Sequence, residues 1–181
     1  MDIKDRTRNL KMIVFDVDGV LTSGQIIFGH DGEAMKIFCA QDGLGIAVAH
    51  KAGLKTAIIT GRESEMVRRR GAELNITDVF QGAMDKAAAF TALAAKHRLA
   101  FDEIAYVGDD LNDLPVLLKA GAAFAVANAV PEVKAVAHYV TARSGGAGAV
   151  REIIELILKA QGKWDGIVTL YSGAGPIETR Q

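Results

Sequence analysis

The sequence has a single cysteine, almost no net charge and no long apolar run. Because Cys39 is alone, no disulfide can form within the chain. The formal net charge of −1 and the pI near 6.4 give no electrostatic basis for binding nucleic acid or a membrane surface. No apolar run approaches the roughly 18 residues needed to cross a bilayer, and the first residues lack the apolar region of a signal peptide. We therefore predict a cytoplasmic protein with no nucleic-acid or membrane partner.

Aromatic residues make up only 6% of the chain, whereas half of its 181 residues are hydrophobic. This length fits one domain with a sizeable core. Strand-like apolar runs alternate with helical segments, which predicts an α/β fold: a Rossmann-like, doubly wound, mainly parallel sheet with helices on both faces. The predicted strands cover about residues 12–15, 54–60, 79–81, 103–107, 122–127 and 138–141, and the predicted helices cover 46–52, 63–74, 85–98, 115–121, a segment from near 131, and 149–161.

A β-hairpin is predicted between the first strand and the first helix, at about residues 25–38. Its turn is indicated by Asp31-Gly32, a strong hairpin signal between two apolar segments. Both arms carry large apolar side chains, more than a ribbon exposed to water could leave uncovered. We expect another surface to cover this hairpin.

The first strand ends abruptly in acid, because the apolar run Met12 to Phe15 is followed by Asp16, Val17 and Asp18. Ligands of open α/β sheets bind at such strand ends. Alternation places the two carboxylates on the same side of the extended chain, so they need a cation or a proton between them. Taken alone, the pattern is equally typical of a surface turn after a strand.

Further polar residues converge on the same sheet edge. Parallel strands bring their carboxyl ends together, so Asp16, Asp18, Thr60 and Asp109 are expected to meet there. A carboxylate cluster without matching histidines or thiolates favours a hard cation, and Mg²⁺ is the usual ion where a phosphate shares the site. Lys86, at a predicted helix start, adds a positive charge that suits a phosphoryl group. Outside this set, Thr60 and Lys86 would be an ordinary strand end and a solvated lysine.

Four motifs in order resemble the haloacid dehalogenase superfamily of phosphotransferases: Asp16-Val-Asp18-Gly-Val-Leu-Thr, Ile-Thr60-Gly-Arg, Lys86, and Gly-Asp109-Asp-Leu-Asn-Asp113. The resemblance implies that Asp16 is the nucleophile that becomes an aspartyl phosphate. It also implies that Asp18 is the acid for the leaving alcohol and then the base for water, and offers its backbone carbonyl to Mg²⁺.

The same resemblance assigns the remaining residues of the predicted site. Thr60 and Gly61 would hold the phosphoryl group, Lys86 would orient Asp16 and offset its charge, Asp109 would bind Mg²⁺ directly, and Asp113 would act from the outer shell. It gives Asp110 no clear role. Superfamily members usually carry a cap domain, for which this chain has no room, so another subunit would have to close the site.

A narrower resemblance rests on the missing cap, on Lys86 and on the stretches Ile27–Glu33, Lys36–Gly45, Ile59–Arg62, Phe80–Gly82, Gly108–Asp113 and Gly145–Glu152. Together these are similar to the family of 3-deoxy-D-manno-octulosonate 8-phosphate phosphatases, tetramers that act in lipopolysaccharide precursor synthesis and whose hairpins pack together at the centre. The resemblance implies a small sugar-acid phosphate as substrate, with Arg62 on its carboxylate, and a homotetramer formed through the hairpin. The match runs from about Lys11 to Trp164, within a single predicted domain of residues 1–164, and the C-terminal tail of residues 165–181 matches less clearly.

Two alternatives remain open. Within the phosphatases, a nonulosonate 9-phosphate is the main rival substrate. In a different class, the receivers of response regulators also combine an Asp acceptor, a Thr, a Lys and an acid-bound Mg²⁺ without catalysing turnover. Receivers have no acid two residues after the acceptor, so Asp18 favours the phosphatase.

Overall fold

A six-stranded parallel sheet forms the centre of the protein, in a computed structural model that describes residues 2–173. The strand order is β5-β4-β1-β6-β7-β8, and every neighbouring pair is parallel. This confirms the predicted fold class. The strands are β1 (Met12–Phe15), β4 (Lys55–Ile59), β5 (Asp78–Phe80), β6 (Ile104–Gly108), β7 (Ala122–Ala125) and β8 (Tyr139–Val140).

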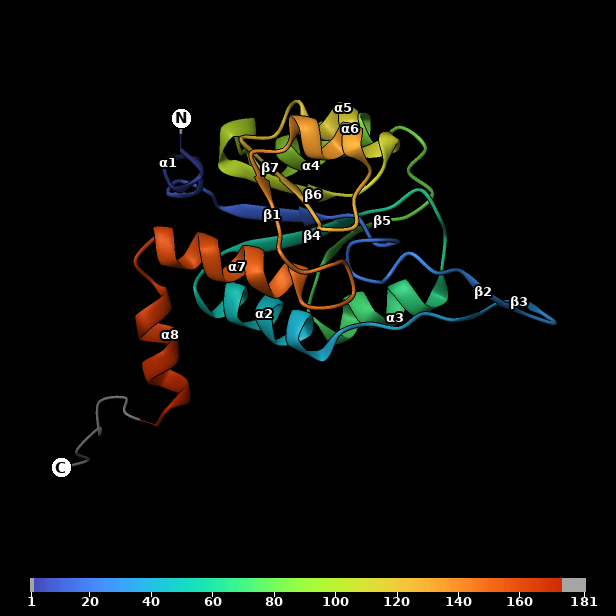
Figure 1. Ribbon diagram of the computed structural model, residues 1–181, viewed down its shortest axis with the longest axis horizontal. Helices are drawn as coiled ribbons and strands as arrows, with labels where there is room; N and C mark the ends of the chain where they lie inside the picture. The colour runs from blue at the N-terminus through green and yellow to red at the C-terminus, as the bar shows by residue number, and fades with distance from the viewer. Residues whose placement is uncertain (1, 174–181) are drawn as a thin grey trace.

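Helices cover both faces of this sheet (Figure 1). One face carries α2 (Ala40–Lys51), α3 (Glu65–Glu73) and α7 (Ala149–Ala160), and the other carries α4 (Lys86–His97), α5 (Leu114–Leu117) and α6 (Pro131–Val136). Two short 3₁₀ turns, Phe101–Glu103 and Leu111–Asp113, precede β6 and α5. Within residues 2–173, no helix combines the length and the apolar character needed to span a membrane.

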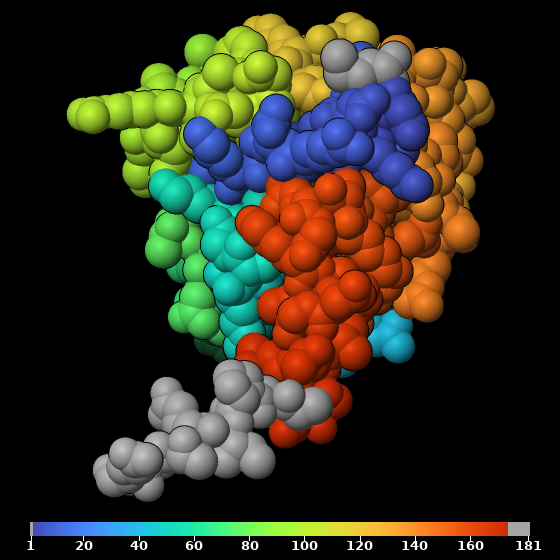
Figure 2. Space-filling model, turned by 90° about the vertical axis from the view of Figure 1, so that its left-hand side faces the viewer, coloured from blue at the N-terminus to red at the C-terminus, as the bar shows by residue number. Residues whose placement is uncertain are grey.

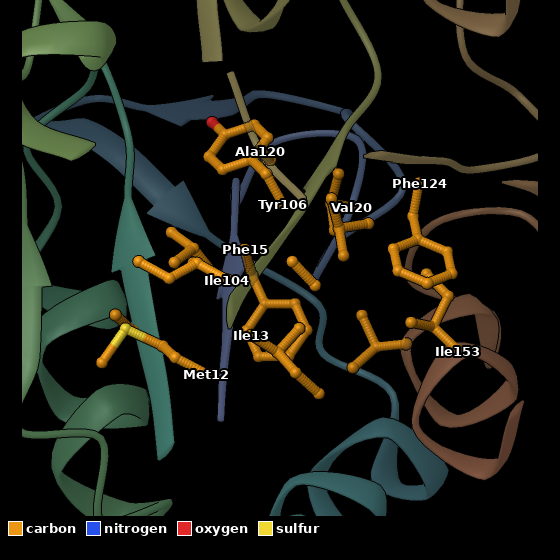
Figure 3. Close-up of a cluster of buried hydrophobic side chains, with 14 of the residues drawn as sticks. Met12, Ile13, Phe15, Val20, Ile104, Tyr106, Ala120, Phe124 and Ile153 are labelled. Carbon is orange, nitrogen blue, oxygen red and sulfur yellow. The ribbon is translucent and has the colours of Figure 1, made fainter. Parts of the chain in front are cut away.

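The core is built around β1, whose four residues are all buried. Because helices cover both faces of the sheet, β1 is a continuous apolar run rather than an alternating one. In Figure 3, Met12 and its register partner Ile104 lie on one side of β1, while Phe124 of β7 and Ile153 of α7 face each other on the other side. Packing on both faces holds the end of β1 rigidly in place, and the acids follow directly after it.

Helix α2 begins at Ala40, six residues before the predicted start. The prediction was wrong because it took Gly43 and Gly45 as loop residues. In the structure, a Cβ added at Gly45 would lie 3.2 Å from the Cα of Arg151 in α7, so glycine lets the two helices approach closely. Packing between α2 and α7 therefore overrides the poor helix propensity of glycine.

The predicted hairpin is present but shorter than expected, with strands β2 (Ile27–Gly29) and β3 (Gly32–Met35). It forms a sheet of its own and projects from the body near the carboxyl end of β1 (Figure 1). Phe28 is 67% exposed and Ile37, just after β3, is 60% exposed. The apolar surface expected on this element therefore faces outward.

The N-terminal segment packs against the end of α7 on the opposite side of the molecule. Figure 2 shows the N-terminal segment lying against the C-terminal helical region. The contact is fixed by the Gln161 side-chain amide, which donates to the carbonyls of Thr7 at 3.1 Å and Leu10 at 2.9 Å. The short helix α1 (Ile3–Thr7) belongs to this contact, and α8 (Trp164–Tyr171) forms the start of the predicted tail. Residues 174–181 of that tail lie outside the described residues.

Candidate active site

Asp16 stands at the carboxyl end of β1, where the chain connections of the sheet diverge. The chain leaves β1 toward β4 on one side, and β6 lies on the other. In α/β sheets such a divergence is the usual place for a ligand. The Asp16 amide donates to the carbonyl of Val107 at 3.1 Å, so the β1–β6 ladder continues into the site. The Asp16 residue is only 5% exposed, so its carboxylate needs polar partners.

A glycine turn brings the carboxylate of Asp109 next to this strand end. Gly19 has φ of +97°, which favours glycine, and a Cβ there would lie 1.9 Å from Oδ2 of Asp109. On its other side, a Cβ added to Gly145 would lie 1.7 Å from the Gly19 carbonyl oxygen. The turn is therefore packed from both sides, and only glycine fits at both positions.

Lys86 supplies the positive charge within this acid cluster. It is the first residue of α4, where the Asp85 side chain caps the helix by accepting from the Ala88 amide at 2.9 Å. Its Nζ lies 2.9 Å from Oδ1 of Asp16 and 2.8 Å from Oδ1 of Asp113. Although burial lowers the pKa of Lys86, the two carboxylates raise it overall, so the ammonium form persists. The lysine is therefore no solvated helix residue but a fixed charge beside Asp16.

Asp113 is completely buried, and protein donors occupy both of its oxygens. Besides Lys86, Oδ1 accepts the hydroxyl of Tyr106 at 2.7 Å. Oδ2 accepts the backbone amides of Asp109 at 2.9 Å and Asp110 at 3.3 Å. Asp113 thus fixes the loop that carries Asp109. Tyr106 could not be selected from the sequence, where it looks like one more apolar position of a buried strand.

The acid cluster fits a divalent cation. Carboxylate oxygens of Asp16, Asp109 and Asp113 lie within 4.8 Å of one another. Because protein donors already hold Asp113, Asp16 and Asp109 are the carboxylates left to coordinate an ion. Among the described residues, Oδ1 of Asp109 is buried and accepts no hydrogen bond. Such an orphaned oxygen is costly unless a cation or a proton joins it.

The pKa values of this cluster show the same need for a cation. Burial, followed by the charge of Asp113, raises the pKa of Asp16 to about 7 despite the opposing effect of Lys86. Burial and the charges of Asp16, Asp113 and Asp110 raise the pKa of Asp109 to about 8. Both raised pKa values mean that the ionised carboxylates have too little positive charge nearby, which a hard cation bound through their oxygens would supply.

The remaining predicted residues line a cavity of about 260 Å³ above the acids. Thr60 follows β4 and is 2% exposed, with its amide donating to the Phe80 carbonyl at 2.9 Å. Gly61 and Arg62 continue this wall, and the Arg62 side chain is 42% exposed. The cavity is lined by Asp16, Asp18, Gly24, Ile26, Thr60, Gly61, Arg62, Lys86, Asp109, Asp110 and Asn112. The structure brings every predicted site residue to this edge, with Asp113 beneath it.

Two charged residues of the hairpin reach this site, and neither was predicted from the sequence to belong to it. Lys36 forms an ion pair with Asp18, and its Nζ lies 3.0 Å from Oε1 of Glu33. Glu33 also accepts a hydrogen bond from the hydroxyl of Ser64, the residue before α3. The available signal was the placement of two charges three residues apart in an arm that is otherwise apolar.

Comparison with known proteins shows which family this chain belongs to. The haloacid dehalogenase-like hydrolase family matches residues 71–154. The 3-deoxy-D-manno-octulosonate 8-phosphate phosphatase KdsC of Escherichia coli strain B / BL21-DE3 is 46% identical over 164 residues, covering 91% of this chain and 87% of that protein. The chain belongs to the family of 3-deoxy-D-manno-octulosonate 8-phosphate phosphatases. It is thus a hydrolase of the phosphatase class, as the motifs predicted.

Solved structures agree with this membership. The 3-deoxy-D-manno-octulosonate 8-phosphate phosphatase of Moraxella catarrhalis, in complex with magnesium ion, phosphate ion and KDO, has a TM-score of 0.91 and 43% identity, covering 93% of this chain and 97% of that one. The cobalt-bound phosphatase of Haemophilus influenzae has a TM-score of 0.89 and 40% identity, covering 93% and 99%. The resemblance stated from the motifs is confirmed, and no support for a signalling receiver arises from these relatives.

Proposed function

We propose that this protein is a Mg²⁺-dependent phosphomonoesterase that hydrolyses 3-deoxy-D-manno-octulosonate 8-phosphate to 3-deoxy-D-manno-octulosonate and phosphate. The observation that carries the proposal is the buried Asp16–Lys86 pair at the floor of a cavity lined by Asp18, Thr60 and Asp109, in a chain 46% identical to a phosphatase of that name. The reaction belongs to lipopolysaccharide precursor synthesis, and the enzyme acts in the cytoplasm.

In this proposal Asp16 is the nucleophile. Lys86 holds its Oδ1, which fixes the carboxylate and leaves Oδ2 for attack. A new bond forms between that oxygen and phosphorus as the bond from phosphorus to the sugar oxygen breaks. The products of this step are an aspartyl phosphate on Asp16 and the free sugar acid. Thr60 and Gly61 hold the phosphoryl oxygens, and Lys86 offsets their charge.

Asp18 carries the proton in both half-reactions. It lies two residues beyond Asp16 and lines the same cavity, which is the position needed to protonate the departing sugar oxygen. The resulting carboxylate then takes a proton from the water that attacks phosphorus. That attack breaks the bond to Asp16, releases phosphate and restores both acids.

The carboxylates of Asp16 and Asp109, with the backbone carbonyl of Asp18, would hold Mg²⁺, and Asp113 supports them from the outer shell through the Asp109 amide. When bound, the cation supplies charge neutralisation for the phosphoryl oxygens and lets two buried carboxylates stand side by side. The metal-containing relatives, with magnesium in one and cobalt in the other, support this assignment.

Substrate choice and assembly are the remaining parts of the proposal. Arg62, half-exposed at the cavity mouth, would bind the carboxylate of the sugar acid with its planar guanidinium. The outward apolar side chains of the hairpin, including Phe28, Met35 and Ile37, would pack against copies of themselves in a homotetramer. Each neighbour would then help to wall a site that has no cap domain of its own.

Steady-state kinetics over a panel of phosphate esters tests the function. The panel contains 3-deoxy-D-manno-octulosonate 8-phosphate, a nonulosonate 9-phosphate and a pentose 5-phosphate without a carboxylate, each with Mg²⁺. We expect the highest kcat/KM for the first compound and none above background for Asp16→Asn. If kcat/KM is higher for the nonulosonate 9-phosphate, that compound is the substrate instead. If the protein becomes phosphorylated without turnover, it is a phosphoacceptor and not a phosphatase.

A further inference from the structure

Lys36 of the hairpin makes a buried contact with the proposed acid of the reaction. Its side chain is 1% exposed, and its ammonium pairs with Oδ1 of Asp18 and, at 3.0 Å, with Oε1 of Glu33. A buried ammonium is expensive unless carboxylates compensate it. The contact is therefore a specific arrangement, like that of Lys86 with Asp16 and Asp113, and not that of a solvated surface lysine.

Asp18 depends on this contact for its orientation. Within residues 2–173, its side chain meets two cations, Lys36 at Oδ1 and the Arg62 Nε 3.8 Å from Oδ2. The Arg62 distance is too long for a hydrogen bond. Lys36 is thus the one hydrogen-bond donor that the described chain directs at the Asp18 side chain. Without it, the carboxyl group would be free to rotate about its own side-chain bonds.

Lys36 is in turn held by residues that join the hairpin to the body. Glu33 accepts from the Ser64 hydroxyl, and the Ser64 amide donates to Oε1 of Gln81 at 2.7 Å. The hairpin shares no strand pairing with the central sheet, so these polar contacts attach it beside the cavity. The series Gln81, Ser64, Glu33, Lys36 ends at the carboxylate of Asp18.

We propose that Lys36 is a positioning residue, which aims the carboxyl group of Asp18 at the oxygen of the leaving alcohol, and that Glu33 and Ser64 hold it in place. The inference rests on the proposed function in taking Asp18 as the proton donor. Proton transfer needs donor and acceptor within about 2.6–3.2 Å, and a misplacement of about 1 Å can cost about 100-fold in rate. The hairpin then takes part in the chemistry as well as in assembly.

The dependence of kcat/KM on the leaving group tests this role, because kcat/KM reports the steps through cleavage of the ester. p-Nitrophenolate leaves without a proton, whereas an alkoxide requires one. For Lys36→Met we expect kcat/KM to fall about 100-fold with alkyl phosphates and to change little with p-nitrophenyl phosphate. Phenyl phosphate should lie between them. Lys36→Arg should restore much of the loss, and Lys119→Met, at an exposed lysine that does not line the cavity, should have no effect.

The double variant Lys36→Met/Asp18→Asn separates positioning from a general structural role. If Lys36 acts through Asp18, the second substitution adds no further loss to Asp18→Asn with alkyl phosphates. A parallel loss across all esters, or no loss with any of them, would overturn the inference, as would full additivity in the double variant. A wild type active on these esters but inactive on the sugar-acid phosphate would instead overturn the proposed substrate, and a wild type inactive on all would overturn both.

Discussion

Replacing Tyr106 with Phe tests whether the buried acid cluster is a connected network. Tyr106 is completely buried and donates its hydroxyl to Oδ1 of Asp113 at 2.7 Å. Burial and the neighbouring carboxylates raise the pKa of Tyr106 well above its usual value, so the phenol remains a neutral donor. Phe keeps the ring and its edge-on contact with Phe90. The substitution therefore removes one hydrogen bond to a charged acceptor without opening a large cavity.

A hydrogen bond to a charged group contributes about 1.5–3 kcal/mol. Lys86 and the amides of Asp109 and Asp110 still hold Asp113 in the variant, so we expect a loss of about 2 kcal/mol in the free energy of unfolding. For a chain of this size, that loss lowers Tm by about 4–8 °C. Thermal and urea unfolding should be measured in chelator, because bound cation would add its own stabilisation.

Tyr139→Phe is the matched control. Its hydroxyl donates to Oε1 of Glu152 at 2.9 Å, but Tyr139 is only half-buried, and the same oxygen also accepts the Ala142 amide. We expect a loss of about 0.5–1 kcal/mol for this variant. If Tyr106→Phe is no more destabilising than Tyr139→Phe, the hydroxyl is not a significant part of the network around Asp113, and our account of that network fails.

Two further predictions concern assembly and the metal site. Ile27→Asp/Ile37→Asp puts charges on the hairpin where we propose that copies meet. Light scattering should then show smaller particles, and kinetics should show a lower kcat/KM for the sugar-acid phosphate. A wild type that is already monomeric and fully active would refute the intersubunit role. In chelator, the free energy of unfolding should fall as pH rises from about 3.8 through about 8, because the raised pKa values of Asp16 and Asp109 keep protons on the folded protein that the unfolded chain has lost. Saturating Mg²⁺ should reduce this slope, and a slope of the opposite sign or one unaffected by Mg²⁺ would contradict the proposed ligands.

The sequence predicted those parts of the site that follow from strand order. Asp16 and Asp109 come directly after apolar strands, and parallel strands must bring their carboxyl ends together. Lys86 could be placed because Asp85 marks a helix start. These positions depend on local pattern and on general topology, and both are visible in a single sequence.

The parts that the sequence did not predict depend on contacts between distant segments. Nothing local distinguishes Tyr106 from an apolar strand residue, since its hydroxyl matters only because Asp113 lies beside it. Lys36 and Glu33 resemble solvated hairpin charges until the hairpin is placed against Asp18 and Ser64. The early start of α2 has the same origin, because packing on α7 decides it rather than helix propensity.

Trapping the phosphoryl group on the protein tests the central claim most directly. The enzyme is mixed with 3-deoxy-D-manno-octulosonate 8-phosphate labelled in its phosphate and Mg²⁺, quenched in acid on the millisecond scale and digested for peptide mapping. We predict that the label appears on Asp16, decays at a rate no slower than kcat, and is absent from Asp16→Asn. Substrate turnover with no label on the protein, label on another residue, or label that persists without release of phosphate would contradict an aspartyl-phosphate phosphatase.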